Sequence, residues 1–197
     1  FAAAVVDPHR PDGGYHHKNL SGVGVAFKLA AALSGDQEAV LNDYADMVCL
    51  GTVADVMPLH GENRVFVSRG LQALRNTQRP GLAALMKQSG CDMQTVNASS
   101  VGYVLAPRIN AAGRMESGRI SGELLTASNV NDAIRIGNEI NEHNNERKNI
   151  DRRITQEALE MVRSGNCLSC ANATIVYNPQ WHKGVVGIVA SRLVEAF

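Results

Sequence analysis

The chain has 197 residues, of which 45% are hydrophobic and 19% are charged, and Lys plus Arg balance Asp plus Glu at 19 each. This length is enough for one full domain or for parts of two. The even charge balance argues against a broadly basic surface that coats nucleic acid, so any such contact needs a local group of cations. Because there is no long apolar span and no signal-like start, we predict a cytoplasmic protein that does not engage a membrane.

The two ends of the chain indicate a piece of a longer protein. The chain opens without Met in an apolar run, residues 1–6, that is typical of a buried strand. It closes in an apolar helical pattern, residues 185–197, that has no polar ending. The four cysteines are scattered and make no disulfide framework, and the lone C-x-x-C of Cys167 and Cys170 indicates ordinary thiols in a loop.

The first predicted helix covers residues 22–33. Ser21 can cap its start and Gly35 lies just behind its end. Spacing predicts a buried face made of Val25, Leu29 and Ala32. The His16–His17 pair upstream is not a metal site in this interpretation, because adjacent side chains do not face the same way and no carboxylate immediately precedes them. We expect this pair in a solvent-exposed loop.

The second predicted helix leads into a single carboxylate, Asp55, that has apolar neighbours on both sides. Apolar residues recur at helical spacing from 39 to 48, Gly51 is predicted to end the helix, and Pro58 prevents a new helix from running through. Burying an ionised carboxylate costs several kcal/mol unless it is paired, hydrogen-bonded or bound to a metal. Asp55 therefore either caps a turn through backbone N–H groups or serves as a metal ligand.

Further helices are predicted over residues 63–75 and 81–88, the second with Pro80 in its first turn. Residues 99–105 also look helical, and we expect Pro107 to disrupt that helix. The segment that follows carries two guanidinium groups, Arg108 and Arg114, which flank Asn110 among small residues. Arginine forms bidentate bonds with phosphate oxygens, which suits a protein that reads a nucleic-acid backbone.

The alternative is that Arg108 and Arg114 form a structural network with carboxylates such as Glu116 and Glu123. The residues alone do not decide between this network and a phosphate site. A similar choice applies to His182 and Lys183, which follow a predicted strand at 173–177 and precede an apolar helix. They could meet a phosphate at the helix N-terminus, or the histidine could hold the loop by hydrogen bonds.

A long helix is predicted over residues 129–163, which contain no proline and a single glycine near the start. Its apolar stripe is interrupted, and the middle, residues 141–148, is polar nearly all round. Such a helix typically bridges two bodies instead of packing fully on one. We therefore predict that it connects two domains.

The segment GTVADVMPL at residues 51–59 resembles the fourth motif of the DHH phosphoesterase superfamily, in the form found in its RecJ-like exonucleases. Three more segments resemble the same family in the same order: LSGVGVAF at 20–27, APRINAAGR at 106–114 and WHKGVVGIVASR at 181–192. Together the four segments cover nearly the whole chain. Four ordered matches are much more specific than any one of them.

The resemblance implies an α/β fold class with three parts. Residues 1–128 would be the helix-rich back part of a DHH domain, residues 129–165 the connecting helix, and residues 166–197 the start of an α/β DHHA1 domain. The cleft between the two domains would bind single-stranded DNA. In the longer protein, a single-strand-binding protein or a helicase could be a partner.

The activity implied by the resemblance is 5′→3′ exonuclease action on single-stranded DNA, with Mn²⁺ or Mg²⁺ as cofactor. Asp55 would be a catalytic metal ligand. The nucleic-acid contacts would come from the cationic and amide side chains singled out above: Arg114, Asn110, Arg108, His182 and Lys183. Hard cations need several ligands, and the motifs that supply the others are not in this chain, so the fragment is expected to be inactive alone.

Two other functions stay open. A DHH phosphoesterase of small molecules or oligoribonucleotides would use the same metal chemistry, but it would usually lack the Arg114 segment and the long helix. A catalytically dead DHH relative that acts as a replication scaffold is the other possibility, and the presence of Asp55 argues against it.

Overall fold

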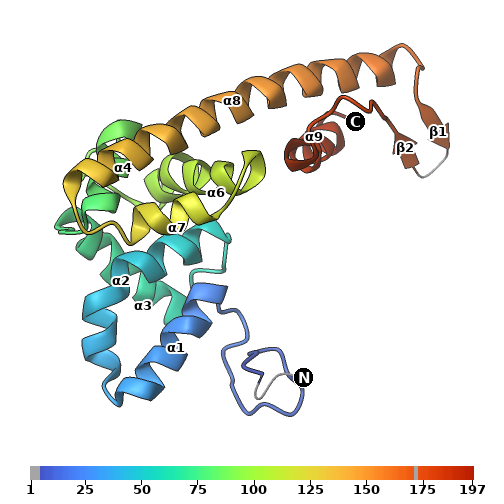
Figure 1. Ribbon diagram of the computed structural model, residues 1–197. Helices are drawn as coiled ribbons and strands as arrows, with labels where there is room; N and C mark the ends of the chain where they lie inside the picture. The colour runs from blue at the N-terminus through green and yellow to red at the C-terminus, as the bar shows by residue number, and fades with distance from the viewer. Residues whose placement is uncertain (1–4, 171–172) are drawn as a thin grey trace. The chain divides into compact units, whose positions relative to one another are not determined.

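The computed structural model describes residues 5–170 and 173–197, which are mainly helical (Figure 1). The chain divides into two compact units. The first unit comprises Phe1–Pro107 and Leu124–Gly137, and the second comprises Arg108–Glu123 and Asn138–Phe197. In the part of the chain that the structure describes, no helix is both long and apolar enough to cross a membrane.

The first unit is built from successive helices joined by short loops (Figure 1). They are α1 Gly22–Ser34, α2 Gln37–Ala54, α3 Gly61–Arg75, α4 Pro80–Ser89, the short α5 Ala98–Ser100 and the π-helical turn η1 Val101–Leu105. The predicted helices at 22–33, 63–75 and 81–88 are confirmed, with ends that differ by one or two residues.

The ends of α1 are set by the predicted capping residues. The Ser21 hydroxyl accepts the N–H of Gly24 at 3.2 Å, and Gly35 adopts a left-handed φ of 74°. The predicted buried face is wrong, however, because Leu29 is 49% exposed while Phe27 is buried. The ring of Phe27 meets Phe66 of α3 edge-on at 5.0 Å, and this aromatic contact turns α1 toward the core of the unit.

Helices α2 and α3 approach each other at Gly70. A Cβ atom at this position would lie 2.1 Å from Cβ of Cys49 and 2.3 Å from the carbonyl oxygen of Ala45, so only glycine fits. Gly51, predicted to end α2, instead lies within the helix, which continues to Ala54. Its missing side chain makes room for Val23 of α1, whose Cγ1 would lie 2.6 Å from an added Cβ.

Pro107 does not end the preceding helix, contrary to the prediction. The π turn η1 runs directly into α6, Ala106–Met115. At the junction, the N–H of Ala106 donates to the carbonyl of Val101, five residues earlier. Proline has no N–H to place in the helix ladder, and the π turn directly before it accommodates the missing bond without ending the helix.

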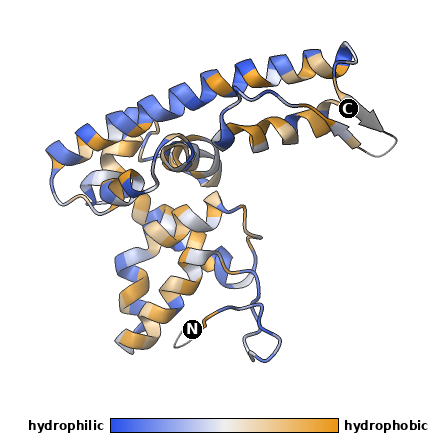
Figure 2. Ribbon diagram, turned by 45° about the vertical axis from the view of Figure 1, so that its right-hand side comes forward, coloured by the Kyte–Doolittle hydropathy of each residue, from blue (hydrophilic) through white to orange (hydrophobic). Residues whose placement is uncertain are grey.

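Helix α8 spans Val130–Arg163, close to the predicted 129–163, and most of its length is hydrophilic (Figure 2). The amide oxygen of Asn129 accepts the N–H of Asp132 at 2.9 Å and so caps the start. The polar middle is not exposed all round, because Asn144 is buried. Between α6 and α8, the chain forms the short helix α7, Arg119–Leu125.

The C-terminal part of the second unit contains a small antiparallel hairpin and one helix. The hairpin pairs β1 Leu168–Cys170 with β2 Ala173–Ile175, and α9 spans Lys183–Ala196. The strand predicted at 173–177 is therefore present but shorter. A cluster of buried apolar side chains from α8 and α9 forms the core here: Ile154, Ala158, Val185 and Val189.

Two predictions for the N-terminal region change. Residues 1–4 of the predicted strand lie outside the described residues, and the described Val5 and Val6 are exposed and belong to no strand. His16 is exposed as expected, but His17 is buried and meets His60 edge-on at 5.7 Å. The small Gly61, where an added Cβ would lie 3.1 Å from the imidazole, leaves room for this ring.

Candidate functional site

Helix α2 ends in a strained turn that presents Asp55. The N–H of Val56 donates to the carbonyl of Val53 at 3.0 Å, and that of Met57 donates to Thr52 at 3.2 Å, which is the Schellman pattern of a helix end. Glycine usually occupies the left-handed position of this motif. Here Val56 occupies it, with a φ of 53°. A left-handed conformation is unfavourable for a β-branched residue, and such strain is concentrated at functional sites.

The Asp55 carboxylate is exposed and makes no hydrogen bond or ion pair with any residue in the described ranges. It therefore does not cap the turn through its side chain, which was the structural alternative. Side-chain hydrogen bonds fix the chain before and after Asp55. The Thr52 hydroxyl lies 3.2 Å from that of Ser21, and the amide nitrogen of Asn63 donates to the carbonyl of Pro58 at 3.1 Å.

An unpaired carboxylate on a fixed turn fits the role of one ligand to Mn²⁺ or Mg²⁺. These hard cations take about six ligands, mostly oxygen atoms, so one carboxylate cannot hold them alone. Within residues 5–170 and 173–197, Asp55 belongs to no group of three metal-ligating side chains. The remaining ligands of such a site would have to come from outside this set.

The cationic segment predicted at 108–114 lies on α6, in the second unit. Asn110 and Arg114 are one helical turn apart, so they share a face, and both are exposed. The Arg114 guanidinium donates to the carbonyl of Gly184 at 3.2 Å, and that of Arg108 donates to the amide oxygen of Asn141 at 3.0 Å. Each of these arginines thus donates to a neutral oxygen atom.

The carboxylates suggested as alternative partners of Arg108 and Arg114 have other neighbours. Glu123 accepts a bond from Arg119 at 2.7 Å, four residues earlier on α7. Glu116 lies 3.5 Å from the imidazole of His143. Among the described residues, neither acid forms an ion pair with Arg114, so these two acids do not neutralise its positive charge.

His182 and Lys183 occupy the start of α9. The Nδ1 atom of His182 accepts the N–H of Gly184 at 3.1 Å, so this ring caps the helix, as its structural interpretation suggested. Lys183 is the first helical residue and is exposed. A Cβ atom on Gly184 would lie 2.2 Å from the carbonyl oxygen of Arg114, so glycine allows the start of α9 to touch the end of α6.

The structure adds two arginines that were not singled out from the sequence. Arg147 of α8 and Arg192 of α9 flank the buried Asp151, at 3.8 Å and 2.8 Å. Burial lowers the pKa of Arg147, Asp151 raises it, and the charges of Arg114 and Arg192 lower it further. We call Arg114, Arg147 and Arg192 the guanidinium cluster, in which Arg147 and Arg192 pair with Asp151 and the charge of Arg114 acts on Arg147.

Two buried donors beside the guanidinium cluster lack an acceptor among the described residues: Nδ2 of Asn144 and Nε of Arg147. The pKa of Lys148 is also lowered, by burial and by the charges of Arg108, Arg147 and Arg152. Excess positive charge and unfilled donors are the features of a site for an anion. The contact of Arg192 with Asp151, 41 positions apart, has no local sequence signal, whereas the i, i+4 spacing of Arg147 and Asp151 could have been noticed.

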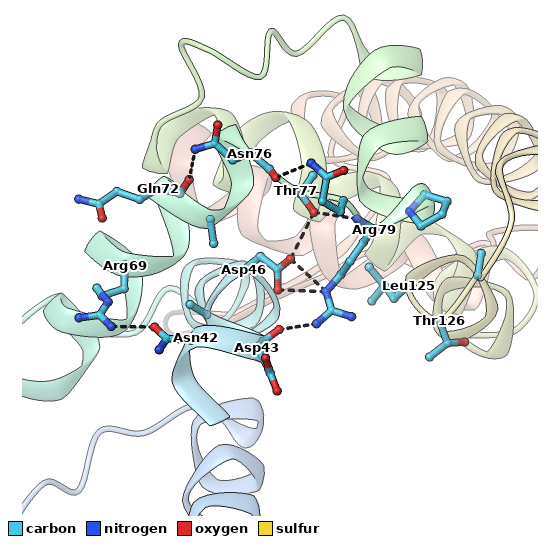
Figure 3. Close-up of a pocket in the computed structure, with 15 residues that line it drawn as sticks. Asn42, Asp43, Asp46, Arg69, Gln72, Asn76, Thr77, Arg79, Leu125 and Thr126 are labelled. Atoms are coloured by element: carbon cyan, nitrogen blue, oxygen red, sulfur yellow. Dashed lines mark hydrogen bonds and ion pairs between the residues drawn. The ribbon is translucent and has the colours of Figure 1, made fainter. Parts of the chain in front are cut away.

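The first unit has a separate polar cavity of about 770 Å³ beside α2 and α3 (Figure 3). Its buried Asp46 accepts bonds from Nε of Arg79 at 3.1 Å and from the hydroxyl of Thr77 at 3.4 Å. Arg79 also lies over the ring of Tyr44, at 5.2 Å from the centroid. None of the predicted site residues lines this cavity, and its central charges are paired with each other.

Comparisons with known proteins give a consistent result. The chain is 43% identical to the single-stranded-DNA-specific exonuclease RecJ of Bacillus subtilis over 98% of this chain, and 38% identical to that of Escherichia coli over 100% of it. The crystal structure of RecJ in complex with Mn²⁺ from Thermus thermophilus superposes with a TM-score of 0.79 at 34% identity, over 94% of this chain and 27% of that one. No family model matches. The chain spans only 24% and 37% of the two curated relatives.

Proposed function

We propose that this chain, which is similar to RecJ in sequence over 98–100% of its length and in fold over 94% of it, is an internal segment of a metal-dependent exonuclease that degrades single-stranded DNA from the 5′ end. The observation that carries the proposal is the match to RecJ over 98–100% of the chain at 38–43% identity. The strained turn at Asp55 and the guanidinium cluster support it, because they supply two features that phosphodiester hydrolysis needs: a carboxylate for a cation and cations for phosphate.

Asp55 is the proposed metal ligand of this segment. The RecJ structures contain Mn²⁺ or Mg²⁺, and when bound such an ion activates water and neutralises the phosphate that is cleaved. Asp55 would hold the ion from the end of α2, with the hydrogen bonds of Thr52 and Asn63 fixing the turn. Because the other ligands would come from elsewhere in a longer protein, the 197-residue chain should not hydrolyse DNA by itself.

The second unit is the proposed binding surface for neighbouring phosphates. Arg114 and Asn110 present one exposed face of α6, with Arg108 and Lys183 as further contacts. His182 would act mainly by shaping the start of α9, since its Nδ1 is already a helix cap. Phosphate contacts carry no sequence information, which suits an exonuclease that must accept any sequence.

The proposed domain division keeps residues 1–128 as the back part of a DHH domain, 129–165 as the connecting helix and 166–197 as the start of a DHHA1 domain. The compact units support α8 as the connection, since the helix passes from one unit to the other after Gly137, but they group residues 108–123 with the second unit. The longer protein would act in the cytoplasm, in DNA repair and recombination, and could work beside a single-strand-binding protein or a helicase.

The test is Asp55→Ala in the longer protein, with release of nucleotides from 5′-labelled single-stranded DNA as the measurement. We expect the rate to fall on the order of a hundredfold or more, since even residues that only support a metal ligand typically contribute 10–100-fold. Asp12→Ala, which removes an exposed carboxylate from a loop, is the matched control and should leave the rate unchanged. Activity near the unsubstituted level at saturating Mn²⁺ would show that Asp55 is not a ligand.

A further inference from the structure

Three side chains of the second unit converge on a point that the proposed exonuclease chemistry does not use. Glu139 and His143 lie on α8, and Glu116 lies just after the end of α6. Each offers one potential metal-ligating atom, and the three atoms lie within 4.8 Å of one another. In the described part of the chain, this is the only such group of three.

The backbone holds these side chains together. Glu139 and His143 are four residues apart on a continuous helix, so they share a face, the spacing that helical metal sites use for paired ligands. The N–H of Glu116 donates to the carbonyl of Ala112 at 2.9 Å, which fixes the turn that carries it. The bond from Arg108 to Asn141 ties α6 to α8 beside the group.

The distance between Glu116 and His143 distinguishes a direct bond from shared coordination. Oε2 of Glu116 lies 3.5 Å from Nε2 of His143, whereas a charge-assisted hydrogen bond between such atoms is about 2.7–2.9 Å long. Two ligands of one tetrahedral zinc ion, each about 2.0–2.1 Å from the metal, lie about 3.4 Å apart. The observed separation is longer than a direct hydrogen bond and close to that of two ligands of one zinc ion.

One nitrogen of the His143 ring has no hydrogen bond among the described residues that would fix its position. Its side chain is 16% exposed, and Nδ1 is buried without a hydrogen-bond partner among the described residues. A buried histidine that stabilises a fold normally satisfies both ring nitrogens. Here Nδ1 has no such bond, while Nε2 lies 3.5 Å from Oε2 of Glu116, and Glu139 belongs to the same group of potential ligands.

We propose that Glu116, Glu139 and His143 bind one Zn²⁺ ion, with water completing the coordination. Two carboxylates, which are hard donors, and one imidazole, which is a borderline donor, favour Zn²⁺ over Mn²⁺ by the general order of divalent affinities. The bound ion links the turn after α6 to α8 and thereby stabilises the second unit. This site shares no residue with Asp55 or the guanidinium cluster, so it stands whether or not the proposed exonuclease function does.

The test is calorimetric titration of the 197-residue chain with zinc chloride. Cys91, Cys167 and Cys170 are replaced by serine to remove competing thiolates, and the buried Cys49 is kept because burial and the nearby Asp46 raise its pKa to about 12. We expect one Zn²⁺ per chain and a rise in melting temperature with zinc concentration. His143→Ala and Glu116→Gln should each weaken binding by about tenfold or more.

Glu142→Gln is the matched control, because it removes an exposed carboxylate next to His143 on the same helix without touching the group. It should bind zinc as the parent chain does, and so should Asp55→Ala. Circular dichroism of each variant without metal checks the fold, and the exposed Glu116 can be replaced with little risk to it. Equal zinc affinity in the parent chain and in Glu116→Gln, or zinc binding that is lost only in Asp55→Ala, overturns the proposal.

Discussion

Two aspartates of this chain show opposite uses of the same side chain. Asp55 is exposed at the end of α2 and has no polar partner in the described part of the chain, whereas Asp151 is 2% exposed on α8 and lies between two arginines. The turn around Asp55 is strained at Val56, while Asp151 lies in the regular interior of a helix. One carboxylate is kept available and the other is fully engaged.

The two environments suit different roles: the exposed Asp55 can bind a metal cation, whereas the buried Asp151 holds arginine side chains in place. A carboxylate that already neutralises arginines has little to offer a metal, because its lone pairs and charge are taken. Asp151 instead keeps Arg147 and Arg192 close together, at the expense of burying charge. An anion that approaches the guanidinium cluster meets three cations and one carboxylate, so the net field favours phosphate.

Of the substitutions that test this comparison, Asp151→Ala should cause the largest loss of folding free energy. The change leaves the Arg147 side chain, which is 11% exposed, without its carboxylate, and breaking a buried pair in this way typically destabilises a protein by about 3–5 kcal/mol. Arg192 is 47% exposed, so its share is reduced by solvent. Urea unfolding of the 197-residue chain measures the loss.

Glu38→Ala is the control for Asp151→Ala. It removes an exposed acid, 68% accessible, that lies 3.1 Å from Arg69, and it should change the free energy of unfolding by less than about 1 kcal/mol. A similar small change for Asp151→Ala would mean that the buried carboxylate is not what holds the cluster.

The next effect is expected from Arg114→Ala in the longer protein. Loss of one charge-assisted bond to a phosphate should weaken single-stranded DNA binding by about 1.5–3 kcal/mol, equally for all sequences. The slope of log affinity against log salt should fall by roughly 0.7 for one lost contact. Arg114→Lys should recover only part, because a point charge replaces a planar fork.

Arg119→Ala is the matched loss of one guanidinium, since Arg119 is exposed and paired with Glu123 on its own helix. Arg119→Ala should lower the affinity for single-stranded DNA by less than Arg114→Ala does. The bond from Arg114 to the carbonyl of Gly184 allows a purely structural role. In that case, Arg114→Ala would lower the melting temperature while the salt slope of the folded protein stayed unchanged, and the DNA surface would lie elsewhere.

The smallest effect, and the most direct measure of strain at the Asp55 turn, should come from Val56→Gly. A left-handed residue costs about 1–2 kcal/mol more for valine than for glycine, and the extra freedom of glycine in the unfolded chain returns part of this. We expect a net stabilisation of about 0.5–1 kcal/mol in urea unfolding, because the valine side chain is 86% exposed and loses little contact.

Val194→Gly is the control, since Val194 is 82% exposed within the ordinary helix α9. Val194 lies in the last turn of α9, where glycine should lower stability only slightly, by less than about 0.5 kcal/mol, the opposite sign. If both variants lower stability equally, the backbone at Val56 is not strained, and strain no longer marks the Asp55 turn as a functional site.

Local chemistry in the sequence was enough to predict much of the fold. Ser21 and Gly35 mark the ends of α1 because capping depends only on neighbouring backbone groups. The buried face of α1 was wrong because it depends on Phe66, which is 39 positions from Phe27 in the chain and therefore invisible to a local pattern. Pro107 was misread because a π turn can bring a proline to a helix start without a break.

The candidate site divides in the same way. Asp55 and the cationic segment of α6 could be singled out because a lone acid among apolar residues and paired arginines are unusual locally. The left-handed Val56 could not be foreseen, since every propensity opposes it. The proposed zinc site is formed by Glu116, Glu139 and His143. The i, i+4 spacing of Glu139 and His143 on a helix can be recognised in the sequence. The proximity of Glu116 depends on how α6 packs against α8, which the sequence does not show.

Because Gly184 has no side chain, a substitution there can change the spacing of the arginines without changing the charge of the chain. The start of α9 touches the carbonyl of Arg114 because nothing projects from residue 184, and Arg192 is carried by the same helix. Even a methyl group there must push the two helices apart, which spreads the cations without altering the net charge of the chain. Uncharged substitutions at residue 184 would therefore change the spacing of the positive groups while their number stays constant.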